Sequence, residues 1–155
     1  MDASRQLDRT GVRLRHESRF YVRGATLRKV VPLRSTAEVG DVWWLPEEQA
    51  RYPGGKDRFC LVVALERAPG ATCAARAHYV VGSTQRGGRP EIVLEAGEAN
   101  LRQRTYFRFW WSGDIDIPTL IQAGRYRGSL ELGRRNEIVA AIRASKRFAL
   151  QRLVN

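Results

Sequence analysis

Short runs rich in β-branched and aromatic residues, bounded by glycine, proline or polar residues, constrain the fold of this chain most. Such runs are typical of strands in a packed sheet. A polar loop at 46–57 and a turn-rich stretch before Pro90 separate neighbouring runs. We expect five strands, at residues 41–45 (DVWWL), 58–65 (RFCLVVAL), 76–83 (RAHYVVGS), 91–95 (EIVLE) and 104–111 (RTYFRFWW), the last closed by Ser112 and Gly113.

The apolar period changes after Gly128. One set of positions recurs at intervals of three and four, while Arg134, Arg143 and Arg147 point elsewhere. This spacing predicts one amphipathic C-terminal helix of about five turns. Its buried face would carry Ile138, Ala141, Ile142, Ser145, Phe148, Ala149 and Leu153. Five short strands followed by a long helix indicate a mainly β or α+β domain.

The size of the chain allows one domain and an appendage. Its 155 residues, 43% of them hydrophobic, are enough for one buried core. Residues 1–36 carry nine basic and three acidic side chains, so we interpret them as a basic N-terminal arm. Residues 37–155 form the expected domain, with the first strand close to Gly40. The arm either binds nucleic-acid phosphates or docks on the domain through aromatic residues such as Phe20 and Tyr21.

The net charge of +11 points to a polyanionic partner, most commonly nucleic acid. All but three of the 27 basic residues are arginines, whose planar donors suit phosphate, although GC-rich coding would also enrich arginine. No run of 18 apolar residues is present, so we expect no membrane span and a cytoplasmic protein. Cys60 and Cys73 lack metal-ligand spacing and are expected to be buried or free thiols.

Four motifs, in the order GDVWWL, GGKDRFCLVV, HYVVGST and RYRGSLELGRRNEIVAAI, resemble the MazF/PemK family of growth-inhibitor toxins over about residues 40–150. The resemblance implies an SH3-like β-barrel of the CcdB/PemK/MazF type. It also implies a homodimer that cuts single-stranded RNA without a metal or other cofactor and that an acidic antitoxin protein neutralises. Two departures are Phe59, where most members have proline, and the absence of a loop glutamate before Arg58.

By position, Arg58 matches the family's active-site arginine and Thr84 its active-site threonine. An arginine is a poor general base, so we expect Arg58 to bind the phosphorane and Thr84 to hold a phosphate oxygen. Asp57 is our candidate for proton transfer or for tuning the site. The plainer alternatives are a strand-entrance salt bridge for Arg58, a turn hydroxyl for Thr84 and a solvated carboxylate for Asp57.

Further residues near these positions are candidate RNA contacts. Tyr52 offers a ring for base stacking, and one ring of each consecutive tryptophan pair is expected on each face of its strand. Strand rise places His78 about 20 Å from Thr84, which favours a structural role for that histidine. The expected RNA-binding residues are Tyr52, Lys56, Ser83, Gln85 and Arg86.

Two functions therefore remain open. The first is the toxin of a type II toxin-antitoxin system, a metal-independent endoribonuclease. The alternative is a non-catalytic nucleic-acid-binding or protein-interaction module on the same barrel. Inhibition of a topoisomerase, as in CcdB toxins, fits less well because the R-x-x-L-V-V block is of the ribonuclease type.

Overall fold

The computed structural model describes residues 34–50 and 57–154. The chain divides into Met1–Ser35 and Thr36–Asn155, and all the described helices and strands belong to the second unit. Most of the expected basic arm, together with Tyr52 and Lys56, lies outside the described residues.

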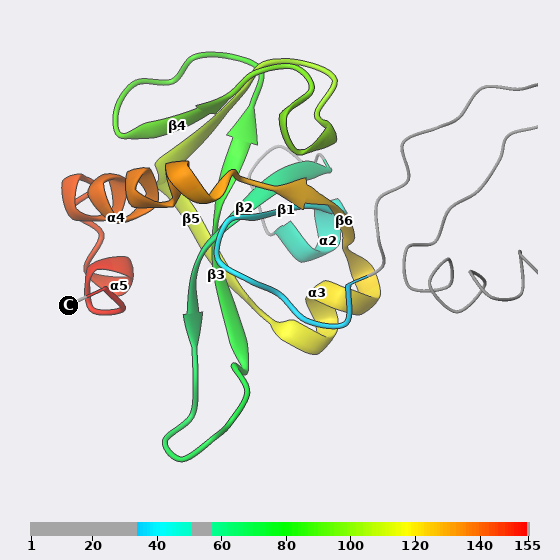
Figure 1. Ribbon diagram of the computed structural model, residues 1–155, viewed down its shortest axis with the longest axis vertical. Coiled ribbons are helices and arrows are strands. Elements are labelled where there is room, and N and C mark those ends of the chain that lie inside the picture. Colours follow the sequence, from blue (N-terminus) through cyan, green and yellow to red (C-terminus); the bar gives the residue numbers. More distant parts are fainter. Residues whose placement is uncertain (1–33, 51–56, 155) are drawn as a thin grey trace, which may run out of the picture. The chain divides into compact units, whose positions relative to one another are not determined.

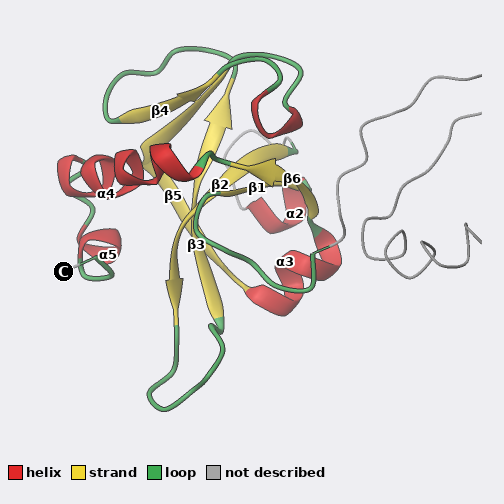
Figure 2. Cartoon of the chain, in the orientation of Figure 1, coloured by secondary structure: helices red, strands yellow, loops and turns green. Residues whose placement is uncertain are grey.

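Six antiparallel strands form one curled sheet in the order β4-β5-β3-β2-β1-β6 (Figure 1). The strands are β1 (Asp41–Leu45), β2 (Arg58–Glu66), β3 (Arg76–Ser83), β4 (Glu91–Leu94), β5 (Thr105–Asp116) and β6 (Arg125–Ser129). Short helices connect or follow them (Figure 2): α2 (Glu47–Ala50), α3 (Ile117–Ala123), α4 (Arg135–Ala144), α5 (Phe148–Gln151) and the 3-10 turns η1 (Glu98–Asn100) and η2 (Leu132–Arg134). The predicted class, mainly β or α+β, is confirmed.

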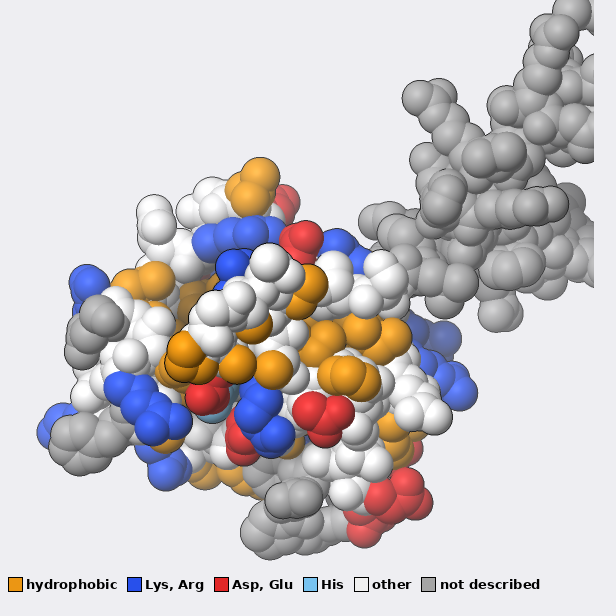
Figure 3. Space-filling view, turned by 90° about the horizontal axis from the view of Figure 1, so that it is seen from below, with side chains coloured by type: hydrophobic (Ala, Val, Ile, Leu, Met, Phe, Trp, Pro, Cys, Tyr) orange, Lys and Arg blue, Asp and Glu red, His pale blue; other side chains and the backbone are white. Residues whose placement is uncertain are grey.

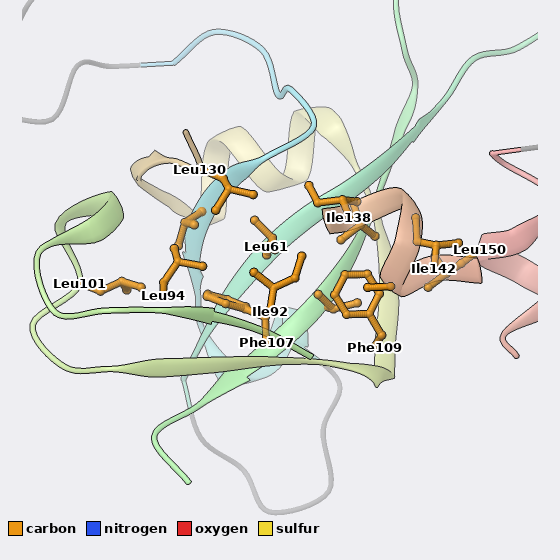
Figure 4. Close-up of a cluster of buried hydrophobic side chains, with 14 residues drawn as sticks. Leu61, Ile92, Leu94, Leu101, Phe107, Phe109, Leu130, Ile138, Ile142 and Leu150 are labelled. Atoms are coloured by element: carbon orange, nitrogen blue, oxygen red, sulfur yellow. The ribbon is translucent and has the colours of Figure 1, made fainter. Parts of the chain in front are cut away.

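Both faces of the sheet are buried. Because side chains alternate along β2, Leu61 and Val63 enter one hydrophobic cluster while Cys60 and Val62 enter another. In the first cluster, Figure 4 shows Phe109 beside Ile142 of α4 and Phe107 beside Ile92 of β4. The second cluster includes residues of α3. The central strands are thus fixed on both sides.

The fifth strand is longer than predicted. Val80 pairs with Ser112 whereas Val81 pairs with Arg108, so the three residues between them form a bulge and the strand continues to Asp116. Gly113 lies within the strand and pairs with Tyr79, and a Cβ there would lie 2.6 Å from the hydroxyl oxygen of Tyr79. That glycine makes room for a packed ring inside the sheet. The bounds of β1 and β3 match the prediction, and β2 and β4 differ by one residue.

The single five-turn helix predicted at the C-terminus is wrong. Helix α4 ends at Ala144, and Lys146 has a φ of 55°, a left-handed conformation that stops the helix before α5. The Ser145 hydroxyl also donates to the Ile142 carbonyl (2.6 Å), an alternative to continued helical bonding. Ile142 is buried before this break, and after it Leu150 is buried whereas Ala149, which was predicted on the buried face, is exposed.

Strand β6 and helix α3 were not predicted. The sequence of β6, RYRGS, has little apolar alternation, and the strand is held instead by polar contacts. Ser129 donates to the buried carboxylate of Asp41 on β1 (2.7 Å), and its hydroxyl also bonds that of Tyr126 (2.7 Å). Helix α3 begins with Asp116 as N-cap, whose Oδ2 accepts from the Thr119 N–H at 3.0 Å.

Candidate functional site

Arg58 begins β2, where it pairs with Leu45 of β1. Its guanidinium carbon lies 5.3 Å from the centre of the Trp111 ring, a cation–π distance. Arg58 is half-buried, and its Nε has no hydrogen-bond partner among the described residues. No described acidic residue forms an ion pair with it. A half-buried cation of this kind is well suited to bind an anion.

Two stacked indoles support Arg58. The Trp110 and Trp111 rings lie 5.7 Å apart at an interplanar angle of 6°, and Trp110 is 39% exposed. The Arg108 guanidinium carbon lies 5.4 Å from the Trp110 ring and 5.8 Å from the Trp111 ring. Arg147 donates to the Trp110 carbonyl. We call four of these side chains, Arg58, Arg108, Trp110 and Trp111, the arginine–tryptophan cluster.

The sequence expectation for the tryptophan pairs is right at one pair and wrong at the other. Trp43 is buried in the core while its neighbour Trp44 is half-buried on the opposite face of β1. Trp110 and Trp111 instead stack on each other, because they lie in the bulge of β5 where strand alternation is interrupted.

Three of the predicted RNA contacts lie at the end of β3, on the chain that connects it to β4. Arg108 donates to the Gln85 carbonyl, and the Gln85 N–H donates to the Ser83 hydroxyl at 3.2 Å. The Arg86 Nε lies 3.6 Å from Glu91 Oε1, so its charge is partly neutralised. This connection therefore adjoins the arginine–tryptophan cluster.

The structure does not bring Thr84 and Arg58 into one pocket. Thr84 lies in the bend after β3 and lines a pocket together with Phe59, whose side chain leaves β2 on the face opposite to Arg58. Asp57 precedes Arg58 in the chain, and its Oδ1 accepts from the Glu47 N–H (3.2 Å) at the start of α2. Among the described residues, Glu47 is the one whose hydrogen bond reaches the Asp57 carboxylate.

Other reactive groups lie away from Arg58 or are inert. Burial raises the pKa of the Cys60 thiol far above its usual value, so it stays protonated and is no nucleophile. His78 is buried, and its Nε2 lies 2.9 Å from Glu66 Oε2. That hydrogen bond is the main cause of the lowered pKa of Glu66. Among the described residues, no group of three or more His, Cys, Asp and Glu side chains is placed to hold a metal ion.

Sequence reasoning did not single out Arg108 or the stacked arrangement of the two indoles. The signal was present as R-x-W-W, but the bulge that aligns both rings depends on pairing with β3. On the face shown in Figure 3, basic side chains form several separate groups around a hydrophobic area, so charge alone would not locate the site.

Comparison with known proteins finds no matching family model and no matching curated protein. The fold and the site define a curled antiparallel sheet domain with an arginine held on stacked indoles at one end. No helix within residues 34–50 and 57–154 is long and apolar enough to cross a membrane.

Proposed function

We propose that this chain is a metal-independent endoribonuclease of the MazF/PemK toxin type, with that family's SH3-like barrel, acting on single-stranded RNA in the cytoplasm. The observation that carries the proposal is the Arg58 guanidinium, half-buried over Trp111 and without an acidic partner among the described residues. A phosphate oxygen would supply the missing hydrogen bonds. Trp110, partly exposed beside it, offers a ring for an unstacked base.

The reaction that suits this arrangement is transesterification within the RNA. The 2′-oxygen attacks the adjacent phosphorus, its proton passes to a base, and the bond to the 5′-oxygen breaks with that oxygen taking a proton from water. Arg58 binds the charged phosphorane oxygens. Asp57 is the proposed base, because its Oδ2 has no hydrogen bond to a described residue. The products are a 2′,3′-cyclic phosphate and a 5′-hydroxyl.

Two partners belong to this proposal. An acidic antitoxin protein complements a chain of net charge +11, and electrostatic attraction would speed their association. A homodimer is the commonest assembly for a small soluble protein of this kind. Ser83, Gln85 and Arg86, on the chain that adjoins the cluster, are proposed RNA contacts, and Tyr52 and Lys56 are proposed contacts from outside the described residues.

The alternative is a non-catalytic RNA-binding module on the same domain. The observation that favours it is the separation of Thr84 from Arg58 on opposite faces of β2, which divides the pair that the family resemblance assigns to one reaction. The described histidine, His78, contacts Glu66 instead of Arg58.

Cleavage of a labelled single-stranded RNA in EDTA separates these two functions. We expect cleavage by the native protein and a loss on the order of 10² to 10³ in rate for Arg58→Ala, as for removal of an oxyanion-stabilising donor. Arg104→Ala is the matched control, since Arg104 is exposed and pairs with Glu95 at 2.7 Å. RNA that is bound but left intact by the native protein would favour the alternative, and a strict magnesium requirement would contradict the mechanism.

A further inference from the structure

The pocket that Thr84 and Phe59 line lies on the face of β2 opposite to the arginine–tryptophan cluster. Its volume is about 520 Å³, within the range of small-molecule sites in proteins. Trp44 of β1 and Phe59 of β2 supply aromatic rings to it, and Arg125 and Arg127 of β6 supply guanidinium groups. Three neighbouring strands, β2, β1 and β6, thus form one side of the pocket, and Thr84 and the segment 101–105 supply the rest of the lining.

Each aromatic ring in this pocket is paired with an arginine. The guanidinium carbon of Arg125 lies 5.3 Å from the centre of the Trp44 ring, and that of Arg127 lies 5.9 Å from the centre of the Phe59 ring. Asn100 holds β6 in place, because its side-chain nitrogen donates to the Arg127 carbonyl at 2.6 Å and its carbonyl accepts from Arg127 Nη2 at 3.1 Å. The cations are thus positioned before any ligand arrives.

The charge of this pocket is not balanced. Arg102, Arg125 and Arg127 all line it, and none of the described residues lining it is acidic. No described residue forms an ion pair or hydrogen bond with the Arg125 guanidinium, and the buried Nε of Arg127 has no described partner. The other lining residues are neutral: Thr84, Leu101, Gln103 and Thr105.

We propose that this pocket binds one nucleotide of the single-stranded RNA substrate, a binding step that rests on the proposed function. A phosphate fits the guanidinium groups of Arg125 and Arg102, and the planar rings of Trp44 and Phe59 suit a base. The end of β3 connects the two sites. Thr84 lines this pocket, and the preceding residue, Ser83, is tied through Gln85 to Arg108 of the cluster.

Thr84 therefore reaches the pocket, and the next residue, Gln85, contacts Arg108 of the arginine–tryptophan cluster. One RNA strand that passes around this end of the sheet contacts both sites. RNA long enough to reach the two sites should bind more tightly than a mononucleotide, since the second contact is intramolecular. The pocket then contributes to affinity while the bond is cut at Arg58.

Fluorescence anisotropy with a labelled 12-nucleotide RNA tests this proposal on the full-length protein. The variants are the pair Arg102→Gln with Arg125→Gln, Arg58→Ala, and the control Arg104→Gln. We expect the pocket pair to weaken binding about tenfold or more and to lower the salt slope by about 0.7 for each phosphate that the protein no longer binds. It should raise KM in the cleavage assay and leave kcat unchanged, and the control should match the native protein.

Three other outcomes would overturn a defined part of this account. RNA affinity unchanged in the pocket pair but reduced by Arg58→Ala would overturn the pocket and leave the proposed function standing. Abolished binding in the pocket pair, with no cleavage by the native protein, would overturn the proposed enzyme and keep the pocket. A second arm titrates adenosine and uridine monophosphates as competitors. A mononucleotide that binds as tightly as the 12-nucleotide RNA would overturn the assignment to an RNA strand and indicate a free nucleotide.

Discussion

A double-mutant cycle between Arg58 and Trp111 tests whether the indole holds the guanidinium in place. The two groups lie 5.3 Å apart, and Arg58 is half-buried. Cation–π pairs contribute about 0.5–1 kcal/mol when exposed and about 2 kcal/mol when desolvated. For the half-buried Arg58 we expect a coupling free energy of about 1 kcal/mol. Arg58→Met keeps the apolar stem of the side chain, and Trp111→Leu keeps an apolar residue in the bulge.

The measurement is urea unfolding of the native protein, both single variants and the double variant. We expect the loss in unfolding free energy of the double variant to fall short of the sum of the single losses by about 1 kcal/mol. The matched control is the same cycle with Arg108→Met in place of Arg58→Met. Arg108 lies 5.8 Å from the Trp111 ring and also contacts Trp110, so its coupling to Trp111 should be smaller.

Additive losses for Arg58 and Trp111, within about 0.3–0.5 kcal/mol, would refute the reasoning. Arg58 would then contact the ring without being held by it, and Trp111 would not position the phosphate-binding group. Equal coupling in both cycles would show that distance does not decide which arginine the indole holds.

Three further predictions concern stability. Arg134→Met should lower the unfolding free energy by about 2 kcal/mol in a urea melt, because the guanidinium donates to Glu98 Oε1 (2.9 Å) and to the Val93 carbonyl (2.8 Å). Gly82→Ala should lower the melting temperature by several degrees, since a Cβ there would lie 2.6 Å from Thr105 Cγ2, and an unchanged melt would contradict that packing. A backbone N–H and then Arg134 lower the pKa of Glu98, so its contribution is present above the ordinary pKa of about 4.3 and is lost as the pH falls through the folded value. Glu98→Gln should therefore flatten the acid side of the stability curve, and an identical acid limb would argue against it.

The strands were predictable where a buried apolar run coincided with a strand. DVWWL and RFCLVVAL are β-branched and aromatic because both of their faces pack into the core, and the ends of these strands were found within one residue. Strand β6 escaped prediction because polar contacts to Asp41 and a pairing with β1 hold it, and neither leaves an apolar pattern. The C-terminal helix was overextended because the apolar spacing carries no sign of the left-handed turn at Lys146, after which Leu150 is buried and Ala149 is exposed.

The candidate site was predictable only in part. The position of Arg58 at the start of a strand follows from its neighbours in sequence, but its ring contact depends on a bulge in β5, about fifty residues away in the chain. Thr84 follows a strand end as expected, and alternation along β3 from Val80, which lies in the same cluster as Leu61, puts it on the face of Phe59. The pairing of Leu61 with Val80 makes Thr84 share a face with Phe59 and not with Arg58, and this register cannot be seen in either strand's sequence alone.

The most direct test of the proposed reaction uses an RNA with a single 2′-deoxy substitution. The native protein is first incubated with an all-ribose oligonucleotide in EDTA to locate the scissile bond and to identify the ends of the products. The ribose on the 5′ side of that bond is then replaced by deoxyribose. The proposal predicts a 2′,3′-cyclic phosphate from the first RNA and no cleavage at that bond in the second, with binding of both. Cleavage at the same bond in the deoxy-substituted RNA would contradict it, because no 2′-oxygen would be present to attack.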